Sequence, residues 1–333
     1  MNVFKLTIYI LSLVSLYAGY LYNESSELQY ILYNDMGQGN YLETSTSRFD
    51  IANFDFPNIS QSAIPMKAIA ARYYFYGGEF DRATEMLHDS RKANPYMMFN
   101  EGLLGEIYNY LQVKDSALYY NEKAFNGLRY NGKHFIELSK SYVRNNSYAK
   151  LDSVFDLIKD KKQPRVWVIY FSSLLTGEEK ISPKGKIYAD EALQYFSERT
   201  HTELMLAAKY VKYGTKNIMQ SLEFENEGSE YFDNQEWIKS ANAYKRASML
   251  NPGQYSHKEN AGIALYKFGY YEEAISYLKV VVDSLNPKTG KSEFILAETY
   301  SAMDKMIEAC DFIRKSIEYN YRPAFTKISE YCK

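Results

Sequence analysis

One stretch near the C-terminus has residue types that could hold a phosphate group. Gly290, Lys291 and Ser292 match the end of a phosphate-binding loop, in which backbone N–H groups and a lysine surround the anion. The motif also needs a glycine five residues before Gly290, and Leu285 stands there instead. The stretch follows an expected helix, whereas the motif follows a strand. We therefore interpret it as a turn between two helices.

Histidine side chains are the next candidates, because imidazole binds metals and exchanges protons near neutral pH. The histidines of the chain are His88, His134, His201 and His257. His134 lies one helical turn from Glu137, and His201 lies one turn from Glu198. A metal site on helices needs several such pairs that converge. We interpret all these histidines as surface or helix-end residues, and we expect no catalytic, cofactor-binding or metal-ligating residues.

The chain has two cysteines, Cys310 and Cys332. Neither has another cysteine or a histidine at a spacing typical of metal ligands. Both fall in the last expected helices, where a disulfide bond between them is geometrically possible. The alternative is two free, partly buried thiols, and the sequence leaves both open.

Charge and composition exclude some classes of protein. The formal net charge is −2 at pH 7, so nothing indicates bulk binding to nucleic acid. Tyrosine is abundant, with 34 copies among 333 residues. We interpret most of these tyrosines as residues that pack between helices.

Helices that recur along the chain must position these side chains. Between Ser221 and Pro323, the small residues Ser240, Ala274 and Ala309 are equivalent, with spacings of 34 (274−240) and 35 (309−274) residues. An upstream set repeats every 34 residues (117−83, 151−117; 108−74, 142−108), and it consists of Ala83, Ala117 and Leu151 with Tyr74, Tyr108 and Tyr142. A period of about 34 residues is typical of the tetratricopeptide repeat, and this chain resembles that family.

The resemblance implies an all-α fold, a tetratricopeptide-type helix–turn–helix solenoid preceded by one N-terminal hydrophobic helix. In such arrays each pair of helices buries its apolar face only by stacking on its neighbours. A chain of 333 residues is long for one compact domain and normal for a solenoid. The family sets a fold without setting a chemistry.

The N-terminal stretch from Leu6 to Asn23 has no charged residue and is just long enough to cross a bilayer core of about 30 Å. We favour an uncleaved membrane anchor over a cleaved secretory signal, because no small-x-small cleavage site is present. A third alternative is a buried helix of the solenoid. Lys5 precedes the stretch and acidic residues such as Glu24 and Glu27 follow it. Basic residues stay on the cytoplasmic side, so the array should lie outside the cytoplasm, and it would be secreted if the stretch were cleaved.

We expect four parts along the chain. They are residues 1–23, a membrane anchor or signal segment; 24–163, an N-terminal array; 164–220, degenerate helical repeats; and 221–333, a C-terminal array with a terminal capping helix. The first repeat is degenerate, and its first helix should run from about Ser26 to Met36. The 34-residue register is lost in the middle part, which is either a pair of degenerate repeats or a bend between two arrays. The capping helix should span Arg322 to Tyr331.

In the family, an inner groove is lined by the first helix of each repeat. Matching positions of this chain give a predicted groove of Arg72, Tyr76, Asn109, Tyr110, Lys140, Arg144, Glu225, Asp233, Tyr266 and Phe294, with Phe75, Glu106, Phe232, Glu259, Lys267 and Glu298 beside them. The N-terminal part of this groove is basic and aromatic, and the C-terminal part is acidic and aromatic. Tyrosine and arginine are good interface anchors, because they combine a large contact area with a polar end.

The resemblance therefore favours a non-enzymatic, membrane-tethered scaffold that binds protein or peptide partners on the extracytoplasmic side. The alternative is an accessory component of cell-envelope polysaccharide assembly or transfer, in which aromatic groove residues stack on the sugar rings of a glycan. No cofactor and no nucleic acid is expected. The sequence contains no constellation of catalytic residues of the kind that an enzyme would need.

Overall fold

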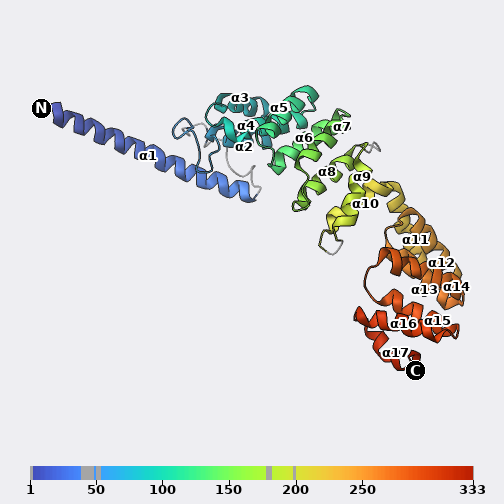
Figure 1. Ribbon diagram of the computed structural model, residues 1–333. Coiled ribbons are helices and arrows are strands. Elements are labelled where there is room, and N and C mark those ends of the chain that lie inside the picture. Colours follow the sequence, from blue (N-terminus) through green and yellow to red (C-terminus); the bar gives the residue numbers. More distant parts are fainter. Residues whose placement is uncertain (1–2, 39–48, 50–53, 178–181, 198–199, 333) are drawn as a thin grey trace. The chain divides into compact units, whose positions relative to one another are not determined.

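The computed structural model describes residues 3–38, 49, 54–177, 182–197 and 200–332 (Figure 1). Within these residues the regular elements are helices, apart from one bridge between Ile59 and Pro65. The helices fall into two compact parts, Met1–Gly185 and Lys186–Lys333, which we call unit 1 and unit 2.

The helices of unit 1 are α1 (Val3–Gln38), α2 (Met66–Tyr76), α3 (Phe80–Ser90), the short 3-10 turn η2 (Pro95–Met97), α4 (Phe99–Tyr110), α5 (Lys114–Gly127), α6 (Gly132–Arg144), α7 (Tyr148–Ile158) and α8 (Pro164–Thr176). The helices of unit 2 are α9 (Gly185–Tyr195, whose first residue belongs to unit 1), α10 (Thr202–Tyr213), α11 (Thr215–Asp233), α12 (Trp237–Leu250), α13 (Tyr255–Phe268), α14 (Tyr271–Val280), the π-helical turn η3 (Val281–Leu285), α15 (Lys291–Ala302), α16 (Met306–Glu318) and α17 (Arg322–Tyr331).

The helices form pairs with the predicted period. In unit 1 the second helices α3, α5 and α7 begin 34 residues apart (114−80 and 148−114), and in unit 2 α12, α14 and α16 begin 34 and 35 residues apart (271−237 and 306−271). The small residues that predict this period are buried, and they include Ala83, Ala117, Ser240, Ala274 and Ala309. The all-α helix–turn–helix solenoid of tetratricopeptide type is thus confirmed.

Close approach of the two helices explains why small residues recur. A Cβ atom placed on Gly262 of α13 would lie 2.6 Å from Cγ of Leu278 on α14, too near for the helices to keep their distance. Gly228 of α11 meets the ring of Tyr244 on α12 in the same way, at 3.0 Å. These two pairs therefore depend on a glycine at the point where their helices cross.

The turn inside each pair has one recurrent backbone geometry. One residue of each turn has a left-handed φ, and these residues are Gly78, Gln112, Asn146, Gln235, Gly269 and Asp304. The residue that follows donates its N–H, at 2.8–3.0 Å, to the carbonyl oxygen five positions earlier, as in a Schellman motif. In unit 1 those acceptors are Tyr74, Tyr108 and Tyr142, the tyrosines whose spacing predicts the repeat. The periodic tyrosines therefore mark the ends of the first helices.

Helix α1 is one continuous helix of 36 residues, about 54 Å long at 1.5 Å per residue. The separate helix expected from Ser26 to Met36 is wrong, because the helix that crosses this region begins at Val3. Residues Phe4–Asp35 are long and apolar enough to cross a membrane, and the apolar window within them is not buried against the rest of the described chain. The second half of the predicted first repeat, residues 39–48 and 50–53, lies outside the described residues.

The second half of α1 packs on unit 1. Ser25, Gln29 and Leu32 are buried and share one face of the helix at spacings of four and three residues. Gln29 donates to Ser25 Oγ at 3.1 Å and accepts from the backbone N–H of Gln61 at 3.0 Å. The hydroxyl of Tyr73 on α2 donates to the carbonyl of Leu32 at 2.8 Å. One helix thus has an exposed apolar half and a half that belongs to the core.

The predicted part boundaries do not coincide with breaks between helices at two places. Helix α1 runs through residues 23 and 24, and α11 runs through residues 220 and 221, because α11 begins at Thr215 and not at Ser221. The middle part contains α8, α9, α10 and the start of α11. The four-part division stays a prediction.

The C-terminal end of unit 2 has the predicted capping helix, since α17 spans Arg322–Tyr331. Its residues Ala324 and Tyr331 pack against Ala297, Ala309 and Ile313 of α15 and α16. The sulfur atoms of Cys310 and Cys332 are bonded, so the structure contains the disulfide and not the two free thiols. The bond closes a 22-residue segment that ties α17 to α16.

Candidate functional site

A hollow of about 440 Å³ opens over the first helices of three successive pairs in unit 1. We call it the groove. Its lining residues are Phe75, Tyr76, Gly78, Phe80, Glu106, Asn109, Tyr110, Glu137, Lys140 and Arg144. They come from α2, the start of α3, α4 and α6. Because these helices stack side by side, residues about 34 positions apart in the chain line a single depression.

One side of the groove is an aromatic ledge. The ring centre of Tyr110 lies 5.3 Å from that of Phe80 and 5.9 Å from that of Phe75, with an edge-on angle of 84° to Phe75. The ring of Tyr76 lies beside Phe75, with ring centres 5.1 Å apart. Tyr110 is 66% exposed and Tyr76 is 39% exposed, whereas Phe75 is buried beneath them. The ledge therefore offers two accessible rings on a rigid apolar base.

The opposite side of the groove is polar and internally paired. Glu137 of α6 is buried, and its two carboxylate oxygens accept from Lys140 Nζ at 2.7 Å and from Asn109 Nδ2 at 3.0 Å. Lys133 Nζ lies 2.6 Å from Glu106 Oε2. These two carboxylates thus cancel two of the cations around the groove.

Arg144 closes one end of the groove at the C-terminus of α6. Its Nη1 donates to the backbone carbonyl of Asn109, near the end of α4, and lies 3.5 Å from Asn109 Oδ1. Ser141 donates to the same Oδ1 at 3.0 Å. Asn109 is therefore held by three side chains of α6, which are Glu137, Ser141 and Arg144.

The structure brings most of the predicted N-terminal groove residues together. Tyr76, Asn109, Tyr110, Lys140 and Arg144 all line the hollow. Arg72 lies one turn before Tyr76, with its Cζ 6.0 Å from the centre of the Tyr76 ring, and does not line it. The side chains that the sequence missed are Phe80 and Glu137, which lie outside the groove positions that the family resemblance supplies.

The predicted C-terminal groove residues are less gathered. Glu225 Oε2 lies 3.3 Å from His257 Nε2, and Tyr266 donates to Glu298 Oε2 at 3.2 Å. Burial and then the neighbouring Glu298 carboxylate raise the pKa of Tyr266 to about 12. Phe294 packs on Tyr321 at a ring distance of 5.4 Å and belongs to the core around α17. Asp233 is exposed at the end of α11.

His134 and His257 lie in the first turns of α6 and α13, at helix ends as expected. Both are buried and not at the surface. His134 lies against Gly102, where it fills the space that a side chain would take. Glu137, one turn away, points to Lys140 and Asn109 instead. Within the described residues, no group of three or more His, Cys, Asp or Glu side chains could hold a metal ion.

The turn expected at residues 290–292 ends at Gly290, because Lys291 and Ser292 are the first two residues of α15. Gly290 has φ +75° and precedes the first residue of α15, and its carbonyl accepts from Ser316 Oγ at 2.6 Å. A side chain at Gly290 would meet Ser316 and Tyr321 of the next pair. The loop is thus packed against the following repeat.

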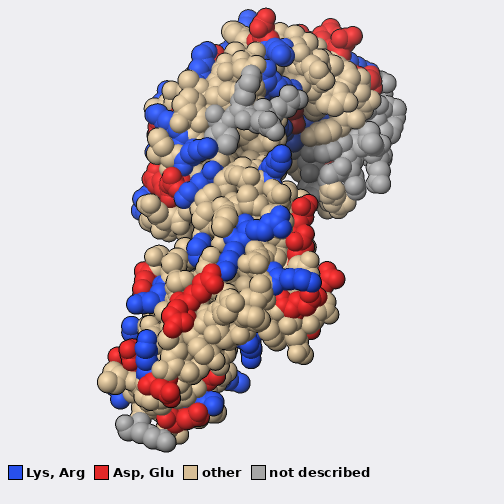
Figure 2. All heavy atoms as spheres, turned by 90° about the vertical axis from the view of Figure 1, so that its right-hand side faces the viewer, with Lys and Arg blue, Asp and Glu red and all other residues tan. Residues whose placement is uncertain are grey.

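Basic and acidic side chains are interspersed over the face of the molecule in Figure 2, without a broad area of either sign on that face. Proteins that bind the phosphate backbone of nucleic acids usually have a basic patch or stripe.

No protein-family model matches the chain, and no curated protein matches it. Solved structures with some likeness include the TPR2AB domain of yeast Sti1 in complex with pHSP90, at 17% identity and a TM-score of 0.32, covering 71% of this chain and 95% of that one. A tetratricopeptide repeat protein from Parabacteroides merdae has 10% identity and a TM-score of 0.32, over 93% of this chain and 100% of that one. YrrB, described as a TPR protein with an unusual peptide-binding site, has 12% identity and a TM-score of 0.29, over 74% and 99%. At these TM-scores the likenesses do not bear on function.

Proposed function

We propose that this chain is a non-enzymatic scaffold, tethered to a membrane by α1, that binds a protein or peptide partner in the groove of unit 1 on the extracytoplasmic side. The observation that supports it most is the aromatic ledge, where two accessible tyrosine rings stand on a rigid base. Such rings contribute large contact areas at low cost in side-chain entropy. The polar wall opposite is already paired within the protein, so a partner would gain most of its affinity from the rings.

The tether is supported by the apolar, unburied first half of α1 and by its length. A bilayer core of roughly 30 Å needs about 20 apolar residues, and α1 has that length to spare. The extracytoplasmic side is supported by Lys5 before the apolar stretch and Glu24 and Glu27 after it. It is also supported by the Cys310–Cys332 disulfide, since such bonds persist in oxidising compartments.

Photo-crosslinking from the ledge tests the proposal in membranes of cells that make the full-length chain. A photoreactive phenylalanine replaces Tyr110 in one variant and Tyr119 in a matched control. Tyr119 is 59% exposed on α5 and does not line the groove. We expect the Tyr110 variant to give a discrete protein adduct at least about fivefold more abundant than the control, because that ring would be covered by the partner. The chain should also stay in the membrane pellet after washing with alkaline carbonate.

Equal adducts from both positions would contradict groove binding, and release of the intact chain by carbonate would contradict the tether. The second candidate function is a role in polysaccharide assembly, which the exposed rings of Tyr76 and Tyr110 also suit, because sugar rings stack on aromatic faces. In that case glycosidases would remove most of the mass that crosslinking adds at position 110.

A further inference from the structure

A second hollow of about 280 Å³ lies next to the groove, at the turn between α4 and α5. We call it the notch. Its lining residues are Tyr108, Asn109, Gln112, Lys114, Ala117, Ser141, Arg144 and Asn145. Asn109 and Arg144 line the groove as well, so the guanidinium of Arg144 stands between the two hollows.

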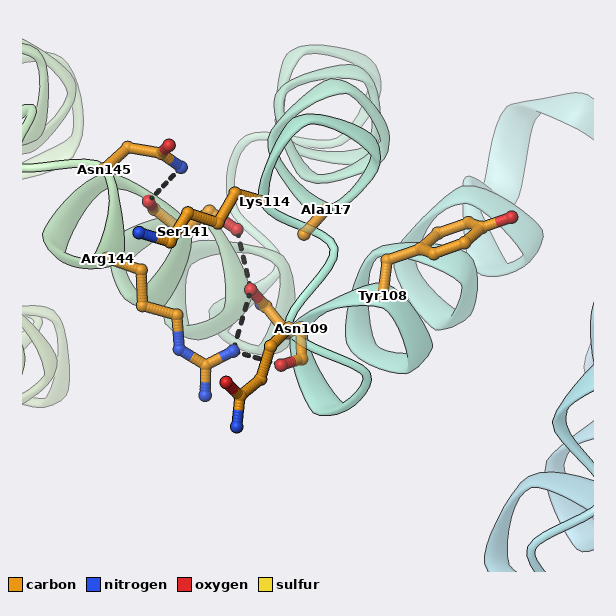
Figure 3. Close-up of a pocket in the computed structure, with 8 residues that line it drawn as sticks. Tyr108, Asn109, Lys114, Ala117, Ser141, Arg144 and Asn145 are labelled. Carbon is orange, nitrogen blue, oxygen red and sulfur yellow. Dashed lines mark hydrogen bonds between the residues drawn. The ribbon is translucent and has the colours of Figure 1, made fainter.

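The notch is lined by two cations and no carboxylate, in contrast to the groove. Figure 3 shows Lys114 reaching from the start of α5 toward the end of α6, where Arg144 lies beside Asn109. Many other cations of this unit are paired, such as Lys133 with Glu106 and Lys140 with Glu137. Within the part of the chain that the structure describes, Lys114 and Arg144 have no carboxylate within 4.0 Å.

Arg144 uses only one of its three guanidinium nitrogens in contacts within the described protein. One nitrogen, Nη1, contacts the carbonyl and side-chain oxygens of Asn109 and anchors that end of the guanidinium. Its Nε and Nη2 groups make no hydrogen bond to any residue that the structure describes, so they remain able to donate. A held guanidinium with free N–H groups is well suited to an oxyanion, because little flexibility is lost on binding.

Donors reach the notch from three elements. Arg144 comes from α6, Gln112 from the turn, and Lys114 is the first residue of α5. The N-terminus of α5 has no side-chain cap, so the first-turn N–H groups and the positive end of the helix dipole lie beside Lys114. Asp115 belongs to the same turn but does not line the notch. Donors that converge from several directions match a tetrahedral oxyanion better than a flat carboxylate, which one guanidinium can bind alone.

We propose that the notch binds a tetrahedral oxyanion, a phosphate or sulfate group, through Lys114, Arg144 and the first turn of α5. The group is either a free ion or an ester carried by a larger ligand. The site does not depend on the groove binding a partner, so each of the two proposals can fail without the other.

Equilibrium dialysis of the full-length chain in non-ionic detergent, against radiolabelled inorganic phosphate at constant ionic strength, tests the site. We expect one saturable site, and we expect Lys114→Gln to weaken it about tenfold, the usual effect of losing one charge-assisted hydrogen bond. Arg144→Lys keeps the charge but loses the fork of donors, and it should weaken binding as well. The matched control is Lys150→Gln on α7, which removes a cation that Glu122 pairs at 3.5 Å and that lines neither hollow, and it should change binding less than twofold.

A second arm replaces inorganic phosphate with phenyl phosphate. Tighter binding of the ester supports an esterified ligand, and equal or weaker binding supports a free ion. The proposal is overturned if phosphate binding does not saturate, or if Lys114→Gln and Lys150→Gln have the same effect.

Discussion

His257 shows how single ionisable residues are built into the repeat interfaces. It lies on α13 with no exposed surface, and its Nε2 is 3.3 Å from Glu225 Oε2 on α11. Burial lowers the pKa of His257 below its ordinary value of 6.5; the Glu225 carboxylate opposes this shift, and Lys258 and Lys209 add to it. The imidazole is therefore held neutral inside the protein near neutral pH.

Acidification should destabilise unit 2 through this residue. Above a pH of about 6.5 His257 is neutral in both the folded and the unfolded chain. Its protonation therefore does not change the free energy of unfolding in that range. As the pH falls below that value, the unfolded chain takes up a proton that the folded chain does not, and the free energy of unfolding decreases until the lower, folded pKa is reached. Urea unfolding followed by Trp237 fluorescence should give a lower midpoint at pH 5.5 than at pH 7.5.

In the variant His257→Gln the urea midpoint should fall less between pH 7.5 and pH 5.5 than in the parent, because glutamine does not titrate. The control is His201→Gln, which changes a partly exposed histidine of the same unit. If both variants keep the full pH dependence of the parent, the dependence arises from other groups.

At the scale of elements, the left-handed turn residue is the feature that six of the helix pairs share. Only two of those six positions hold glycine, and the others hold Gln112, Asn146, Gln235 and Asp304. A side chain in the left-handed region costs roughly 1–2 kcal/mol relative to glycine. The turns are formed in spite of this cost, because the helices on both sides pack against their neighbours.

Gln235→Gly should therefore raise the free energy of unfolding of unit 2 by about 0.5–1 kcal/mol, after the greater entropy of glycine in the unfolded chain is subtracted. The matched control is Gln220→Gly, an identical change at an exposed position inside α11, where it should lower the free energy of unfolding by about 1 kcal/mol. Urea unfolding of both variants measures the difference. A loss of stability in Gln235→Gly would contradict the role of the turn geometry.

Much of the element level could be read from the sequence, because the small residues and the tyrosines repeat with the period of the helix pairs. The bounds of α17 and the gathering of Tyr76, Tyr110 and Lys140 follow from that register. Phe80 was missed because it reaches the groove from the start of a second helix. The continuity of α1 was missed because the uncharged stretch ends at Asn23 and the acidic Glu24 and Glu27 follow it. Only the partners Gln61 and Tyr73 show that one face of the following turns is buried.

At the scale of the whole molecule, each unit has its own stabilising contacts and its own tryptophan. Trp167 is buried in α8 of unit 1, and Trp237 begins α12 of unit 2. The disulfide belongs to unit 2 alone. Stability can therefore be measured for each unit separately with variants that keep one tryptophan.

Removal of the disulfide should affect the units unequally. Closing 22 residues with such a bond stabilises a fold by about 3 kcal/mol, mainly by restricting the unfolded chain. In the double variant Cys310→Ser and Cys332→Ser, the free energy of unfolding reported by Trp237 should fall by that amount, so its urea midpoint should be lower. The urea midpoint reported by Trp167 should not change. Equal shifts at both tryptophans would show that the two units unfold together.

Because α1 is continuous, the proposed membrane tether also sets the rotation of unit 1 around the helix axis. Successive residues of a helix turn by about 100°, and the face with Ser25, Gln29 and Leu32 is fixed to unit 1. With the apolar half held in a bilayer, one residue inserted near Asn23 would swing unit 1 around the helix axis by about 100° while lifting it only about 1.5 Å. Seven inserted residues would lift unit 1 by about 10 Å and return it to within about 20° of its original orientation. The number of residues in α1 between the membrane and unit 1 therefore sets the direction, about the helix axis, in which the groove faces.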